Sequence, residues 1–190
     1  MNLKTTFLAV ALSLSAAAVN AQSTVPDGYT KASITLANGT IQAGYIKDNI
    51  KKSASVIFID ENGSNKKVYE GSDINAVTVD AVNYTCINGD FFKAICTGKL
   101  CFLQKASNAS GKASYNGTEA VFNNGTEGKI GDYFIYADKK LKLINKKSVE
   151  SFITTDLATC TAAVEKAKAI NGDIAKLQEA VEIYNSYTAK

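Results

Sequence analysis

Three of the four cysteines lie in one stretch, NYTCINGDFFKAICTGKLCFLQK, which spans positions 83–105. Cysteines this close together could bind a metal ion, carry out redox chemistry or form disulfides. Zinc sites and redox sites both use Cys-x-x-Cys pairs, and many zinc sites add histidine. This chain has wider spacings and no histidine. We therefore expect no metal and no cofactor, which leaves disulfides or reduced cysteines packed as small hydrophobic side chains.

The first candidate disulfide joins Cys96 and Cys101. Gly98-Lys99 reads as a two-residue turn between FFKAIC and CFLQK. Such a turn sets Cys96 directly opposite Cys101, at a position where the side chains of paired strands are closest. An oxidising compartment would favour the bond.

The second candidate disulfide joins Cys86 and Cys160. Cys86 is expected opposite Phe91 beside an Asn-Gly turn, and the alternation of strand residues places it on the other face from Cys96. Cys160 falls on the apolar face of a predicted helix, so this bridge would tie the helical region to the sheet. The alternative is that both thiols stay free, because sequence separation does not give distance in space.

The absence of histidine excludes Ser-His-Asp and Cys-His catalysis. A Ser-x-x-Lys pattern begins at Ser64, but it lies in a polar turn where the lysine would stay charged. A pair of carboxylates, as glycosidases use, is the other route to an enzyme. We assign no catalytic residue, because the acidic residues mostly stand at turns. They include Asp60, Glu70, Asp73, Asp80, Asp90, Glu119 and Asp132.

Two tyrosines are candidates for stacking on a ligand. In the strand-like sequence YFIY, alternation puts aromatic rings on both faces, with Tyr133 and Tyr136 on opposite sides. One face could stack on a sugar or a peptide. Ordinary packing within the sheet is the interpretation that we favour.

The charge pattern does not indicate a nucleic-acid partner. The formal net charge is +3, and every basic residue is lysine. The chain therefore lacks the bidentate guanidinium that reads guanine and clamps phosphates. The lysine pairs are scattered beside turns, which is typical of solvated charges.

The N-terminus has the pattern of a secretory signal peptide, which we assign to residues 1–21. Lys4 precedes an apolar run from Phe7 to Val19, and the small-x-small pattern that ends at Ala21 marks the cleavage point. This run is shorter than the ~20 residues of a spanning helix. We expect an exported chain that does not span the membrane and is periplasmic, associated with the outer membrane or extracellular.

Residues 22–145 form the predicted β-rich domain. Asn-Gly, a strong hairpin signal, recurs at positions 38, 62, 88, 116 and 124 between alternating apolar runs. A two-residue turn at Asn38-Gly39 would pair Leu36 with Ile41, Ile34 with Ala43 and Ala32 with Tyr45. We expect further strands at 55–60, 67–70, 76–79, 82–87, 90–96, 100–105, 119–122, 129–137 and 141–144, with a loop at 106–112. Many short strands favour an antiparallel barrel or sandwich-like sheet.

Residues 146–190 are predicted to form a helical hairpin packed on the β-rich domain. Apolar residues recur at helical spacing after Asp156 and again after Asn171-Gly172. Asp156 and Asp173 are the expected N-caps of the two helices, and Gly172 ends the first. The fold class that follows is mainly β, α+β, with a C-terminal helical hairpin.

The segments YTKASITLANGTIQAGYIKDN, SVIFID and VYEGSDINAVTV resemble small exported proteins of Bacteroidota. Their shared pattern is a strand, an Asn-Gly turn, a Gly-aromatic-Ile strand and an Asp-Ile turn. The likeness covers roughly residues 29–84 and continues loosely into the helical tail. The resemblance implies an envelope location and a β-rich fold, and it supplies no catalytic residue.

The sequence predicts an exported, non-catalytic binding or accessory module of the bacterial envelope. Its partner would be an envelope protein, a peptide or a glycan. A secreted hydrolase that uses a carboxylate pair is the alternative. A cleft with two buried acidic side chains would favour the hydrolase, and an aromatic or apolar patch would favour the binding module.

Overall fold

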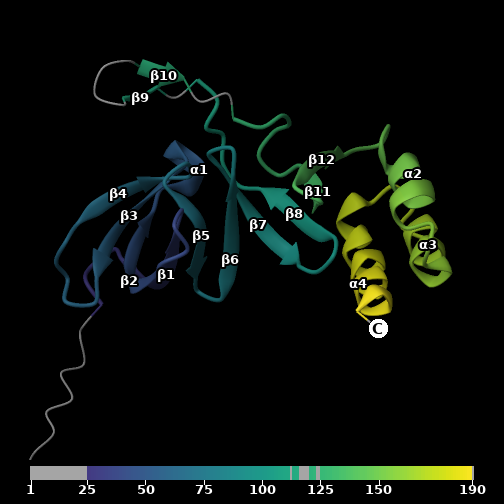
Figure 1. Ribbon diagram of the computed structural model, residues 1–190, viewed down its shortest axis with the longest axis horizontal. Coiled ribbons are helices and arrows are strands. Elements are labelled where there is room, and N and C mark those ends of the chain that lie inside the picture. Colours follow the sequence, from purple (N-terminus) through teal and green to yellow (C-terminus); the bar gives the residue numbers. More distant parts are fainter. Residues whose placement is uncertain (1–24, 112, 116–119, 123–124, 190) are drawn as a thin grey trace, which may run out of the picture.

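A computed structural model describes residues 25–111, 113–115, 120–122 and 125–189. The chain is mainly β, with a ten-stranded antiparallel sheet, a separate two-stranded sheet and C-terminal helices (Figure 1). The predicted class, α+β, is therefore confirmed. The predicted signal peptide, residues 1–21, lies outside the described residues.

The main sheet consists of two meanders joined side by side. Its strand order is β12-β11-β8-β7-β6-β5-β1-β2-β3-β4, so β1 lies beside β5 and β8 lies beside β11. The two-stranded sheet, β9 and β10, interrupts the second meander. The strands are β1 (Thr30–Leu36), β2 (Ile41–Asp48), β3 (Ser55–Asp60), β4 (Lys67–Glu70), β5 (Ile74–Val79), β6 (Val82–Ile87), β7 (Asp90–Cys96), β8 (Cys101–Lys105), β9 (Ala113–Tyr115), β10 (Ala120–Phe122), β11 (Tyr133–Ala137) and β12 (Lys140–Ile144).

The ten-stranded sheet is open. Strands β12 and β4 are its two edges, and the sheet is not closed into a barrel. Of the two arrangements that the sequence allows, the closed one is thus wrong. Edge strands can recruit other chains, and both edges here carry lysine, a residue that opposes such pairing.

The first hairpin differs from its predicted register by one residue. Thr35, and not Leu36, lies opposite Ile41. The cause is a turn of three residues instead of two. The N–H of Leu36 donates to the carbonyl of Thr40, and Gly39 takes a φ of +85°, as three-residue hairpin loops require.

The slip changes the pairing of the other residues in this hairpin. Ile34 lies opposite Gln42 and Ala32 opposite Gly44, so the predicted pairs with Ala43 and Tyr45 are wrong. Ile41 is 70% exposed as a result. A shift of one residue exchanges the two faces of a strand, which is why turn length decides what is buried.

Most other strand predictions agree with the structure. The bounds of β3, β4, β6 and β7 are confirmed, and those of β5, β8 and β12 differ by one or two residues. The predicted strand 129–137 is shorter, because β11 begins at Tyr133. Position 119 lies outside the described residues, and β10 begins at Ala120. Sequence analysis missed β9 and the short helix α1 (Ile50–Ser53).

The C-terminal region is helical but more segmented than a simple hairpin. It contains α2 (Val149–Ser151), the π-helical η1 (Phe152–Asp156), α3 (Thr161–Lys168), the 3-10 turn η2 (Ile174–Lys176) and α4 (Leu177–Thr188). The prediction that Asp156 caps the first helix is wrong, because α3 begins after Cys160 and Asp156 pairs with Lys142. Asp173 does cap the second helical segment, accepting from the N–H of Ala175.

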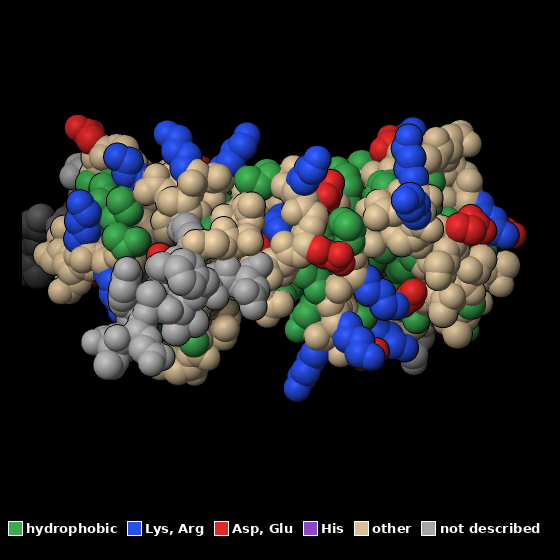
Figure 2. Space-filling view, turned by 90° about the horizontal axis from the view of Figure 1, so that it is seen from above, with side chains coloured by type: hydrophobic (Ala, Val, Ile, Leu, Met, Phe, Trp, Pro, Cys, Tyr) green, Lys and Arg blue, Asp and Glu red, His purple; other side chains and the backbone are tan. Residues whose placement is uncertain are grey.

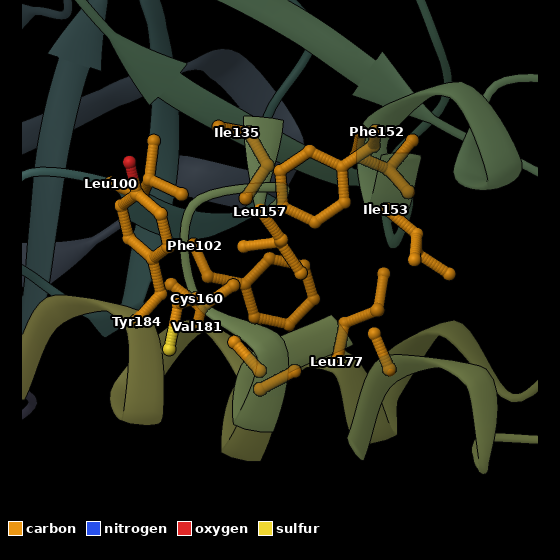
Figure 3. Packing of buried hydrophobic residues seen from close by; sticks show 14 of the residues in the cluster. Leu100, Phe102, Ile135, Phe152, Ile153, Leu157, Cys160, Leu177, Val181 and Tyr184 are labelled. Carbon is orange, nitrogen blue, oxygen red and sulfur yellow. The ribbon is translucent and has the colours of Figure 1, made fainter. Parts of the chain in front are cut away.

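Two separate apolar cores hold the sheet. The N-terminal core is made by β1 to β7 and α1, and it includes Ile34, Val56 and Phe91. The C-terminal core lies between the sheet and the helices, which cover the right-hand part of Figure 1. Figure 3 shows Phe102 and Ile135 of the sheet pointing toward Leu157, Phe152 and the helical side chains.

A smaller apolar cluster lies on the other face of the C-terminal strands. Its buried members are Phe92, Leu103 and Phe134. Phe92 and Phe134 meet edge to face, with ring centroids 5.2 Å apart. Among the described residues, no helix is both long enough and apolar enough to cross a membrane.

Candidate functional site

The structure does not place Cys96 opposite Cys101. The predicted register holds from Phe92, opposite Lys105, to Ala94, opposite Leu103, and then shifts so that Cys96 faces Phe102. The shift is a β-bulge, in which two residues of one strand oppose one residue of the other. The predicted facing of the two cysteines is therefore wrong.

The bulge turns the two cysteines toward different clusters. Cys96 joins Ile95 against the C-terminal core, whereas Cys101 packs with the smaller cluster on the other face. Asn185 of α4 holds the following loop by accepting from the N–H of Leu100 at 2.9 Å and donating to its carbonyl at 2.8 Å. The loop thus follows the helix instead of closing a simple two-residue turn.

Cys86 and Cys160 lie in different cores. Cys86 faces Phe91 as predicted and packs against the N-terminal core, while Cys160 is buried in the C-terminal core. The predicted separation of Cys86 from Cys96 by strand face does not hold beyond the bulge, but the two thiols still contact different clusters. All four cysteines are free thiols in this structure.

Burial makes two of these thiols poor nucleophiles. Loss of hydration raises the pKa of Cys86 to about 12. It raises the pKa of Cys96 to about 11, with a smaller opposing effect from a hydrogen bond to the backbone of Phe102 and small contributions from Glu182 and Cys101 that raise it further. Thiolates are the reactive form, so both side chains are inert near neutral pH.

The two candidate stacking tyrosines serve the packing of the sheet. Tyr133 stacks on Phe102, with ring centroids 5.2 Å apart and an interplanar angle of 14°. Tyr136 packs against the smaller cluster on the other face. The predicted placement on opposite faces is confirmed, so the two rings cannot grip the same ligand.

A buried ion pair, which sequence analysis did not single out, joins β7 to β8. The ammonium of Lys105 lies 3.1 Å from Oδ2 of Asp90, and both side chains are 0% exposed. Lys105 also donates to the carbonyls of Thr126, Glu127 and Gly128 at 2.7, 3.1 and 3.3 Å. Its charge is therefore fully engaged within the protein.

Asp90 is equally well satisfied. Oδ1 accepts from the hydroxyl of Ser107 and the N–H of Ala109, and Oδ2 accepts from the N–H and hydroxyl of Thr126. A buried charge is tolerated when it is paired and hydrogen-bonded in this way. We interpret the Asp90 cluster, defined by these residues and Lys105, as structural.

A hollow that we call the central cleft lies between the two cores and has a volume of about 350 Å³. Its floor is a row of three side chains set by strand register, since Tyr84 lies opposite Lys93 and Lys93 lies opposite Gln104. The same face of β7 carries Phe91 on one side of Lys93 and Ile95 on the other. The lining residues are Asp48, Ile50, Lys51, Tyr84, Lys93, Gln104, Lys105, Ala106, Ile130 and Gly131.

The walls of the central cleft come from distant parts of the chain. One wall is the end of β2 with α1, where Asp48 accepts from the N–H of Ile50 at 2.7 Å. The opposite wall is the segment before β11. There the side-chain amide of Gln104 donates to the carbonyl of Gly131 at 3.2 Å, which fixes the orientation of the amide. The hollow is thus bounded by anchored groups.

The polar groups of the central cleft are available to a ligand. Lys51 and Lys93 are exposed, and neither forms an ion pair with any described residue. Burial, with a further contribution from the charge of Asp48, raises the pKa of Tyr84, so its hydroxyl stays protonated. Lysines also occur at several other places along the face shown in Figure 2.

Two other hollows are occupied by interactions of their own. Between β2 and β4, the ammonium of Lys67 lies 4.5 Å from the ring centroid of Tyr69, and both Tyr69 and Phe58 are buried. Between α3 and α4, Lys166 pairs with Glu179 across the groove. The central cleft is therefore the better candidate site.

The chemistry that the central cleft offers is recognition through cations and hydrogen-bond donors. Its lining contains one carboxylate, Asp48, whereas a glycosidase needs two. Asp90 is the one buried acidic residue in the described part of the chain, and it is paired. Among the described residues, no three acidic, cysteine or histidine side chains gather as metal ligands would.

Comparison with known proteins finds no matching family model, no matching curated protein and no matching solved structure.

Proposed function

We propose that the protein is an exported, non-catalytic binding or accessory module of the bacterial envelope. Its ligand is a polar group of an envelope protein, a peptide or a glycan, held in the central cleft. Export rests on the signal-peptide pattern of residues 1–21 and on the resemblance to exported Bacteroidota proteins.

The observation that carries the proposal is the interruption of the apolar face of β7. Phe91 and Ile95 pack into the two cores, yet Lys93 between them is exposed and has no ion-pair partner among the described residues. A position flanked by cores on both sides would serve stability better if it were apolar. A lysine there, above a hollow with anchored walls, is suited to a ligand.

The test combines binding, turnover and location. We expect a mixed panel of glycans and peptides to give saturable changes in the backbone amide NMR signals of Tyr84, Lys93 and Gln104. No panel member should be consumed, and the exported form should begin at Gln22. Turnover that is abolished by replacing one Asp or Glu would contradict the binding function and favour the carboxylate hydrolase. Retention of residues 1–21 in a cytoplasmic form would contradict export.

A further inference from the structure

The charges that line the central cleft do not balance. Lys51 and Lys93 are exposed, whereas the side chain of Lys105 projects from the opposite face of the sheet and its ammonium pairs with Asp90. The single carboxylate of the lining, Asp48, is partly engaged, because one oxygen accepts from the N–H of Ile50 at 2.7 Å. The hollow therefore has an excess of positive charge before any ligand enters.

Hydrogen-bond donors lie on the same floor as Lys93. Gln104 uses one amide hydrogen on the carbonyl of Gly131, which leaves the other hydrogen to be donated. The hydroxyl of Tyr84 can also donate. Cross-strand neighbours have Cβ atoms roughly 4.5–5.5 Å apart, so these three side chains can reach one small group.

The walls add apolar surface. This surface comes from Ile130, which is 41% exposed, because Ile50 in the opposite wall is only 3% exposed and packs in the N-terminal core. A volume of about 350 Å³ lies within the range of small-molecule sites. The hollow is thus suited to an organic molecule with a carbon skeleton and not only to a free inorganic ion.

We propose, as a refinement that rests on the binding function proposed above, that the ligand of the central cleft carries an oxyanion. Lys51 and Lys93 bind its oxygens, Tyr84 and Gln104 donate further hydrogen bonds, and Ile130 contacts its carbon skeleton. A carboxylate and a phosphate share this chemistry. An acidic sugar is the simplest ligand class that combines these features.

The experiment titrates the labelled protein with three sugars of similar size at constant ionic strength. Glucuronate supplies a carboxylate, glucose 6-phosphate supplies a phosphate, and glucose is the uncharged control. We expect saturable NMR shifts of the Tyr84, Lys93 and Gln104 amides with at least one charged sugar, and the stronger one identifies the oxyanion. Glucose should bind at least about tenfold more weakly, because a charge-assisted hydrogen bond is lost.

Matched variants locate the binding groups. Lys93→Gln should weaken binding of the charged sugar about tenfold, and Lys51→Gln by a smaller factor because its side chain is less constrained. Lys31→Gln, at an exposed strand position outside the cleft, should bind like the original protein. Unchanged thermal unfolding of each variant shows that the fold is intact.

Three results would contradict the proposal that the ligand carries an oxyanion. These are equal binding of glucose and the charged sugars, equal effects of Lys93→Gln and Lys31→Gln, and no shift in the cleft with any charged sugar. Each leaves the binding function standing if a neutral glycan or a peptide from the wider panel shifts the same amides. Turnover of a panel member contradicts the binding function itself.

Discussion

Lys93 and Lys105 belong to neighbouring strands, but they differ in burial and in their ion-pair partners. Lys105 is fully buried, and its ammonium contacts one carboxylate and three carbonyls. Lys93 is exposed in the central cleft and has no ion-pair partner among the described residues. Since Lys93 faces Gln104 while Lys105 faces Phe92, they project from opposite faces of the sheet. The comparison teaches that satisfied partners, and not residue type, separate a structural charge from a candidate binding charge.

The largest expected effect comes from replacing the buried lysine. Lys105→Met should lower the free energy of unfolding by about 3–5 kcal/mol, because it leaves Asp90 buried without its counter-charge. Urea unfolding measures the loss. The matched control is Lys93→Met. Equal losses of stability in the two variants would contradict the distinction between a structural lysine and a binding lysine.

The dependence of stability on pH tests whether water reaches Cys86 and Cys96, which pack against the two cores. The pKa values of Cys86 and Cys96, about 12 and about 11, lie above the ordinary thiol value of 9.0. The folded state therefore keeps protons that the unfolded state releases, so stability is intact below pH 9 and falls as pH rises toward 11 or 12.

By pH 10 the two thiols together should cost about 2 kcal/mol, after allowance for the half-exposed position of Cys96. The measurement is urea unfolding at pH 7, 9 and 10. The control is the variant with Cys86→Ala and Cys96→Ala, which should lose less stability over this range. Parallel pH profiles for the two proteins would show that water reaches these thiols.

The partly buried hydrogen bonds of Asn185 should contribute an intermediate stability. Their loss should cost less than the loss of Lys105 and more than the loss of Lys93. Asn185→Ala removes two hydrogen bonds to Leu100 and should cost about 1–2 kcal/mol. Asn75→Ala is the control, because Asn75 donates to carbonyls at an exposed site and should change stability by less than about 0.5 kcal/mol. If thermal unfolding gives the reverse order, burial is not what sets these energies.

The smallest effect is expected at the cleft itself. Lys93→Met should lower the free energy of unfolding by no more than about 0.5 kcal/mol, because removing an exposed ammonium without an ion-pair partner loses little. Binding of the charged sugar should fall in the same variant. A loss of several kcal/mol in urea unfolding would mean that Lys93 is structural after all.

Local sequence signals predicted the strands but not the surroundings of their side chains. The bounds of β3, β4, β6 and β7 follow from turn residues that act within a few positions. The loop that follows the bulge at Cys96 is held by Asn185, which is 85 residues from Leu100 in sequence. A pattern of strand alternation contains no information about such a contact, so the disulfide geometry was predicted wrongly.

Sequence analysis also missed the Asp90 cluster and the central cleft, because their residues come from distant parts of the chain. Asp90 follows an Asn-Gly turn and resembles an ordinary turn carboxylate, yet its partners Ser107 and Thr126 lie 17 and 36 residues away. The cleft combines β2, α1, the central strands and the segment before β11. One signal was available: Lys93 interrupts the apolar stretch DFFKAIC at a position that faces the same side as Phe91 and Ile95.

The Asp90 carboxylate has a further consequence for protein engineering. One of its oxygens holds the chain at Ser107 and Ala109, and the other holds it at Thr126. Both ends of the intervening segment are thereby anchored to a single group, whatever residues lie between them. Since both anchors lie outside the segment, we expect them to stay in place when it is lengthened. Anchored ends of this kind are what a display scaffold for grafted epitopes requires.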